Sequence, residues 1–114
     1  ANVGDYIKGT KAPIYSIVEG CAASAATLMS VVADKRFMTE HAFMLIHQLS
    51  GGVWGTYEDI VDNKKNCDRL MKMIKKIYLE HTKIPKKKLD SILKTDIWLD
   101  AKQCLEYGLV DEII

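Results

Sequence analysis

The sequence has no excess of charge of either sign, because 16 lysines and arginines are balanced by 15 aspartates and glutamates. Such a chain lacks the global field that recruits nucleic acid or an anionic membrane. The densest basic stretch, Lys83 and Lys86–Lys88, has no interleaved aromatics and is interpreted as a solvated face. No apolar run reaches the roughly 20 residues of a membrane span, and residues 1–11 do not resemble a secretion signal. We therefore expect a soluble protein with no nucleic-acid or membrane partner.

Cysteine is also scarce. Cys21, Cys67 and Cys104 are odd in number and widely spaced, with no Cys-x-x-Cys pair and no histidine at zinc-finger spacing. This pattern argues against a disulfide framework and favours free thiols in a reducing compartment. We expect a cytoplasmic protein, or one of an organelle matrix or stroma. No histidine pairs with a second ligand at metal spacing, so no metal or other cofactor is expected.

A length of 114 residues with 48% hydrophobic content predicts a single domain, 1–114, with one core. No internal repeat, low-complexity stretch or linker is evident. Apolar runs and glycine or proline boundaries divide the chain into alternating elements. Strands are predicted at 13–19, 36–38, 42–46, 97–99 and 109–113, and helices at 3–10, 24–34, 57–81, 86–94 and 101–107. The alternation indicates an α/β fold, in which strand 13–19 and helix 24–34 are expected to be buried.

The predicted helix at 57–81 is unusually long for so small a domain. It contains no glycine or proline, and its apolar residues recur at spacings of three and four. Its length of about 35 Å exceeds what the domain can cover, so part of it should project. A second apolar row, Val61, Met73 and Leu79, either contacts a partner subunit or merely widens the core-facing stripe.

Ser24 stands in a run of glycine, cysteine and alanine at 20–26, between a predicted strand and a predicted helix. Small neighbours leave room for a substrate backbone, and the first N–H groups of a helix can stabilise an anion. Ser24 is therefore a candidate nucleophile. Taken alone, it is better explained as an ordinary helix cap.

A serine nucleophile needs a base and a third group that orients the base. His47 follows a predicted strand and precedes a glycine-rich segment, whereas His41 lies in a polar turn and His81 in the last turn of the long helix. Asp96 stands between a helix end and an apolar strand and is the favoured orienting carboxylate. Asp100, a plausible helix N-cap, and Asp111 are rivals that the sequence leaves open.

Several blocks of the chain resemble one enzyme family. They are the serine run, LIHQ at 45–48, SGG at 50–52, EHT at 80–82 and EYGLVDEI at 106–113. Their order and spacing across 20–60 and 81–114 are similar to those of the proteolytic subunit of Clp protease, the ClpP family of serine peptidases.

The resemblance implies Ser24 as nucleophile, His47 as base and Asp96 as the triad aspartate, with the Ala25 backbone N–H in the oxyanion hole. It implies a crotonase-like spiral of β-β-α units, here partial and without its N-terminal strands, with a projecting handle at 48–81. It further implies a homo-oligomer of seven-membered rings, possibly two stacked. Its substrate would be unfolded polypeptide fed by an AAA+ Clp ATPase, and the partner, not this chain, would use ATP.

The chain also departs from the family pattern. The glycine loop that supplies the second oxyanion donor in the family lies upstream of this sequence. Ala25 replaces a usual methionine, and Leu49 a common proline. Lys94 and Thr95 replace an Asp-Arg pair associated with contacts between rings, so the two-ring stack stays open.

Three other interpretations compete with a Clp-type serine endopeptidase. A signal-peptide peptidase would need a catalytic lysine, and an acyl-CoA hydratase would not need Ser24, His47 and Asp96 together. The third possibility is a catalytically silent ring subunit with an assembly or regulatory role.

Overall fold

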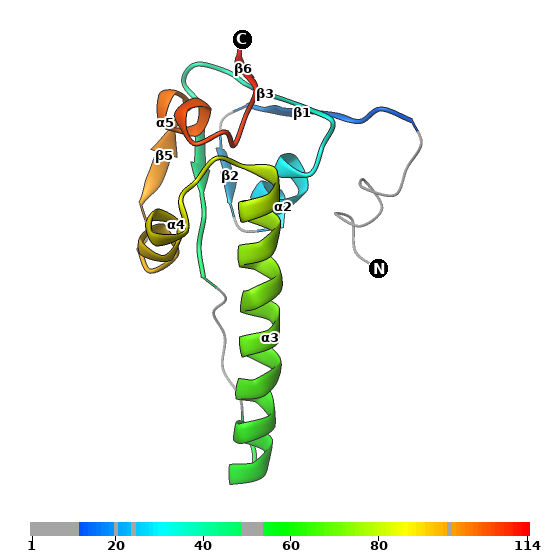
Figure 1. Ribbon diagram of the computed structural model, residues 1–114, viewed down its shortest axis with the longest axis vertical. Helices are drawn as coiled ribbons and strands as arrows, with labels where there is room; N and C mark the ends of the chain where they lie inside the picture. Colours follow the sequence, from blue (N-terminus) through cyan, green and yellow to red (C-terminus); the bar gives the residue numbers. More distant parts are fainter. Residues whose placement is uncertain (1–11, 20, 24, 49–53, 96) are drawn as a thin grey trace.

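The computed structural model describes residues 12–19, 21–23, 25–48, 54–95 and 97–114 and shows a mixed α/β fold (Figure 1). Two three-stranded sheets have the orders β1-β3-β6 and β2-β4-β5. The strands are β1 (Tyr15–Val18), β2 (Cys21–Ala23), β3 (Lys35–Met38), β4 (Phe43–Leu45), β5 (Trp98–Asp100) and β6 (Glu112–Ile113). The helices are α2 (Ala25–Val31), α3 (Tyr57–His81), α4 (Lys86–Leu93) and α5 (Ala101–Glu106). The predicted α/β class is confirmed; the helix predicted at 3–10 lies outside the described residues.

The chain alternates between the two sheets. β1 and β3 pair in parallel in the first sheet, and β2 and β4 pair in parallel in the second. In chain order, two consecutive strands, one in each sheet, are followed by a helix. The segments β1-β2-α2 and β3-β4-α3 are therefore two successive β-β-α units. The sequence shows no repeat, but the backbone repeats the same supersecondary unit.

Most elements lie where the sequence predicts them, and the differences have local causes. β2 is missed because its three residues, Cys-Ala-Ala, carry no alternating pattern. The expectation that strand 13–19 is buried is wrong: β1 is an edge strand, and Tyr15 and Ile17 are largely exposed. The last strand begins late because the N–H groups of Leu109 and Val110 donate to the Cys104 carbonyl and so finish α5.

The core forms where the inner faces of the strands meet the helices. Helix α2 is only partly buried, since Thr27, Ser30 and Val31 face inward while Ala26 is exposed. The fully buried large side chains come from every layer: Tyr78, Met38, Met44, Ile46, Leu89, Leu93, Leu109, Val31 and Val110. These contacts make one continuous hydrophobic cluster.

Helix α3 extends far beyond the rest of the molecule, as the sequence predicts (Figure 1). Its 25 residues measure about 37 Å, and the molecule is 50 Å in its longest dimension. Thr56 and Asp59 close its N-terminus with a reciprocal capping box. Within the described ranges, no helix is both long and apolar enough to cross a membrane.

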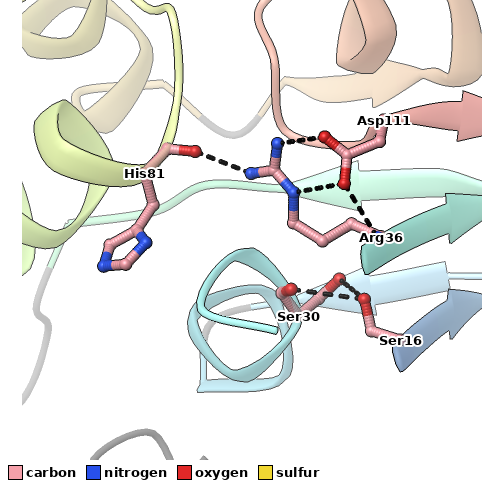
Figure 2. A network of polar contacts seen from close by, with 5 residues as sticks. All are labelled: Ser16, Ser30, Arg36, His81 and Asp111. Carbon is pink, nitrogen blue, oxygen red and sulfur yellow. Dashed lines mark hydrogen bonds and ion pairs between the residues drawn. The ribbon is translucent and has the colours of Figure 1, made fainter. Parts of the chain in front are cut away.

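A half-buried arginine anchors the C-terminus of α3. Arg36 of β3 donates from Nη1 to the His81 carbonyl at 2.7 Å and from Nη2 to Asp111 Oδ1 at 2.8 Å (Figure 2). These bonds of Arg36 tie the last turn of α3 to β3 and to the segment before β6. Nearby, the Ser16 hydroxyl of β1 contacts the Ser30 hydroxyl of α2 at 3.1 Å.

Candidate active site

Three strand ends meet at one edge of the second sheet. Parallel pairing sets Ala23, the last residue of β2, opposite Leu45, the last residue of β4. Antiparallel pairing sets Leu45 opposite Trp98, the first residue of β5. The chain therefore leaves β2, leaves β4 and enters β5 at the same edge. All three predicted triad residues follow or precede these ends by one or two positions.

Of the three predicted triad residues, His47 is the one that the structure describes, and its segment is held on both sides. The preceding Ile46 is fully buried in the core. The following Gln48 donates its backbone N–H to the Leu93 carbonyl of α4 at 3.1 Å. His47 itself is half-buried between these two anchors. An imidazole at such a place combines a defined backbone position with access to solvent, as a general base requires.

Ser24 and Asp96 lie outside the described residues, but the chain on each side of them is described. Ala23 ends β2 and Ala25 begins α2. Before residue 96, Thr95 donates both its N–H, at 3.1 Å, and its hydroxyl, at 3.0 Å, to the Ile92 carbonyl. The C-terminal carbonyls of α4 thus hold the segment before residue 96 through Ile92 and the segment after β4 through Leu93.

The two rival carboxylates, Asp100 and Asp111, make hydrogen bonds in other parts of the fold. Asp100 lies opposite Phe43, at the far edge of the sheet from Leu45, and its side chain accepts from the Gln103 N–H at 2.8 Å as the N-cap of α5. The N-cap role of Asp100 is therefore confirmed. Asp111 belongs with the other sheet, where its hydrogen bond with Arg36 holds the pKa of its carboxyl below the usual range.

The other histidines are also remote from this edge. His41 is nearly fully exposed in the turn before β4, with Nε2 3.1 Å from the Glu40 carboxylate. His81 ends α3, and its carbonyl accepts from Arg36. His47 is the histidine that belongs to the converging strand ends.

The two described thiols show no sign of a catalytic role. Cys104 is fully buried in α5, and its thiol is 3.7 Å from the Leu99 carbonyl. Burial raises the pKa of this thiol to about 12, so the reactive thiolate is scarce at neutral pH. Cys67 is free and half-buried on α3, away from the second sheet. As for metals, the described ranges contain no group of three or more His, Cys, Asp or Glu side chains that could hold an ion.

An apolar hollow of about 410 Å³ lies between β1 and α2. Its lining comes from β1, α2 and the turns beside them, and includes the exposed Tyr15 and Ile17. This hollow flanks the first sheet, while His47 stands at the edge of the second.

Two contacts that frame the site were missed by sequence reasoning. One is the Thr27 hydroxyl, which donates to the Leu45 carbonyl at 3.1 Å. The other is the bond from Gln48 to the C-terminus of α4. Both join residues distant in sequence, and no local pattern signals them. The one available clue is a polar threonine in a helix whose other residues, apart from Ser30, are apolar.

Comparison with known proteins gives matches to one family. A family model described as Clp protease matches residues 1–114. The chain is 36% identical to ATP-dependent Clp protease proteolytic subunit 2 of Treponema denticola, over 96% of this chain and 56% of that protein. It is 31% identical to proteolytic subunit 1 of Chlamydia caviae and 30% identical to that of Chlamydia muridarum, over 98% of this chain. It spans 61% and 60% of those two proteins, so it covers well under two thirds of the relatives it matches.

Proposed function

This chain belongs to the Clp protease family, and we propose that it carries the Ser-His-Asp site of a serine endopeptidase acting on unfolded polypeptide. Ser24 is the nucleophile, His47 the general base and Asp96 the residue that orients the imidazole. The observation that supports this most is the register that aligns Ala23, Leu45 and Trp98.

The register matters because a triad works only when its side chains are within hydrogen-bond reach. Cα atoms of paired residues in adjacent strands lie about 4.5–5.5 Å apart. Ser24 is one residue beyond Ala23, and each residue adds at most about 3.8 Å. His47 follows Leu45, and Asp96 precedes Trp98, by two residues. These limits allow the three side chains to converge from three different elements.

The chemistry then requires only the protein's own groups. His47 accepts the proton of the Ser24 hydroxyl as the oxygen attacks a peptide carbonyl, and gives it to the leaving amine as the C–N bond breaks. A water, deprotonated by His47, then attacks the resulting Ser24 ester, which releases the carboxylic acid and returns the proton to Ser24. Asp96 holds the imidazole tautomer and stabilises its cation. The Ala25 N–H, in the first turn of α2 and without an intrahelical partner, would donate to the oxyanion. A second donor would come from residues that the longer relatives have outside the matched range.

We also propose the assembly implied by the family. Helix α3 has exposed apolar residues along its projecting length, including Ile60, Leu70 and Met73. Covering them in an adjacent subunit would remove apolar surface from water. The handle would contact an adjacent subunit in a ring assembly, with the sites on the inside of the ring. Each subunit would be a crotonase-like spiral that includes the two β-β-α units. An AAA+ ATPase would deliver the substrate and consume the ATP.

The decisive experiment is covalent labelling of the full-length, assembled protein with a fluorophosphonate probe. We expect an adduct on Ser24 that is absent in Ser24→Ala and strongly reduced in His47→Ala. Asp96→Asn should lower the labelling rate by orders of magnitude, about 10⁴-fold in well-studied triads.

Asp100→Asn is the matched control, because asparagine also caps helices well and the site should be untouched. Wild-type protein without an adduct on Ser24 would refute the peptidase proposal and leave a catalytically silent subunit. Equal loss in Asp96→Asn and Asp100→Asn would refute the assignment of the aspartate. A monomeric mass in light scattering would contradict the ring assembly.

A further inference from the structure

Thr27 has an uncommon environment for a polar residue. It lies in the first turn of α2, is fully buried, and donates its hydroxyl to the carbonyl of Leu45 at 3.1 Å. In the part of the chain that the structure describes, Thr27 and Ser30 are the only buried residues with polar side chains apart from Tyr78 and Cys104, and both belong to α2.

The direction of the Thr27 hydroxyl is informative. Threonine in a helix interior commonly turns its hydroxyl back to a carbonyl three or four residues earlier, but Thr27 is the third residue of α2, and the carbonyls at those positions precede the helix. Here the hydroxyl instead crosses to a strand of the second sheet. Valine has nearly the same shape and would fill a buried site without a polar atom to satisfy. The hydroxyl therefore has a role that packing alone does not require.

The two buried hydroxyls hold the two ends of α2 to different sheets. Ser30, near the C-terminus of the helix, contacts the Ser16 hydroxyl of β1 in the first sheet. Thr27, near the N-terminus, holds the helix to the last residue of β4 in the second sheet. Strand pairing fixes where β2 and β4 end, but it does not fix the direction in which α2 leaves β2. The bond from Thr27 supplies that constraint.

We propose that Thr27 is a positioning residue for the reaction. Its hydroxyl sets the start of α2 against the end of β4, and thereby sets the separation between Ser24, just before α2, and His47, two residues after Leu45. This inference rests on the peptidase function proposed above. It assigns to Thr27 no contact with substrate.

The test compares hydroxyl-retaining and hydroxyl-deleting variants of the full-length, assembled protein. Thr27→Val should lower kcat on a fluorogenic peptide and the rate of fluorophosphonate labelling by tenfold or more, about the loss that a small misplacement of reacting groups causes. KM should stay within about twofold, because the residue does not touch substrate. Thr27→Ser should recover most of the rate. Thr39→Val is the matched control, because it deletes a hydroxyl that donates to the Val18 carbonyl in the first sheet; we expect its kcat to be unchanged.

The possible outcomes separate the two proposals. Wild-type protein that is not labelled refutes the peptidase proposal and this inference with it. Wild-type protein that is labelled, together with Thr27→Val at the wild-type rate, overturns the inference alone. A rate loss shared equally with Thr39→Val, or one not restored by Thr27→Ser, also overturns it, since either points to general destabilisation. Should Thr27→Val not fold, Thr27→Ala and Thr27→Ser differ by one hydroxyl and decide the same question.

Discussion

Replacing Arg36 should loosen the attachment of α3 to the sheets. The side chain is 12% exposed, and its guanidinium makes three hydrogen bonds: Nε to Asp111 Oδ2 at 3.1 Å, Nη2 to Asp111 Oδ1 at 2.8 Å, and Nη1 to the His81 carbonyl at 2.7 Å. The last of these places a cation at the C-terminus of α3, where the helix dipole favours it. Arg36→Met removes all three bonds and keeps most of the buried side-chain volume.

The expected loss of stability follows from how deeply each hydrogen-bond partner of Arg36 is buried. A hydrogen bond to a charged group contributes about 1.5–3 kcal/mol when buried. Asp111 is 44% exposed, so water replaces much of what its carboxylate loses. The contribution of the Arg36–Asp111 pair to stability is therefore smaller than that of a buried pair. The substitution keeps the backbone N–H of residue 36, which donates to Asp111 Oδ2 at 2.9 Å in the wild-type protein. We expect a total loss of about 2–3 kcal/mol in the free energy that protects this junction from opening.

Amide hydrogen exchange measures that loss locally in the full-length protein. A change of about 2–3 kcal/mol corresponds to roughly 30- to 150-fold faster exchange. We expect it in peptides covering residues 78–84 and 109–114, where Thr82, Asp111 and Ile114 donate backbone hydrogen bonds. Lys64→Met breaks an exposed ion pair with Asp68 on the projecting part of α3 and should leave these peptides unchanged. Exchange in Arg36→Met within threefold of wild type would refute the reasoning.

Two further predictions concern the same end of the molecule. Arg36 lowers the pKa of Asp111, so the stabilisation from this pair should be complete above about pH 4, the usual range of an aspartate, and be lost as pH falls through the lower folded pKa. In urea unfolding, the difference between wild type and Arg36→Met should therefore be constant from pH 5 to pH 7 and narrow at pH 3; a difference that widens at pH 3 would contradict this. Gly108 has a φ of 70° and ends α5, and an added Cβ would meet the Lys83 backbone nitrogen at 2.9 Å. Gly108→Ala should cost about 2–3 kcal/mol in the same measurement, whereas an effect below 0.5 kcal/mol would show that the junction relaxes freely.

Local signals account for the parts of the fold that the sequence predicted. The bounds of α3 were predicted because the segment has no glycine or proline and its apolar residues follow helical spacing. Helix α5 was predicted from Asp100 at its start and Gly108 at its end, and both perform those roles. The roles assigned to Ser24, His47, Asp96 and the Ala25 N–H all stay predictions, and Ser24 and Asp96 also lie outside the described ranges.

The relation between the strands could not be predicted in the same way. Pairing of β2 with β4 joins residues 22 positions apart, and pairing of β4 with β5 joins Leu45 to Trp98. No local pattern encodes which residues stand opposite each other. For this reason the sequence left Asp96, Asp100 and Asp111 as competing carboxylates. The register now separates them, because Asp100 stands at the opposite edge and Asp111 belongs to the other sheet.

The register itself is set by core packing at a distance from the chemistry. Strands β4 and β5 are three residues long, and their central residues, Met44 and Leu99, stand opposite each other and are almost fully buried. Phe43 and Trp98 occupy the other face and are each 45% exposed. A slip of one residue would exchange the two faces, bringing Met44 or Leu99 into solvent and forcing a large aromatic into a filled core. The alignment of Leu45 with Trp98, on which the proposed pairing of His47 with Asp96 rests, therefore depends on two apolar side chains that take no part in the proposed reaction.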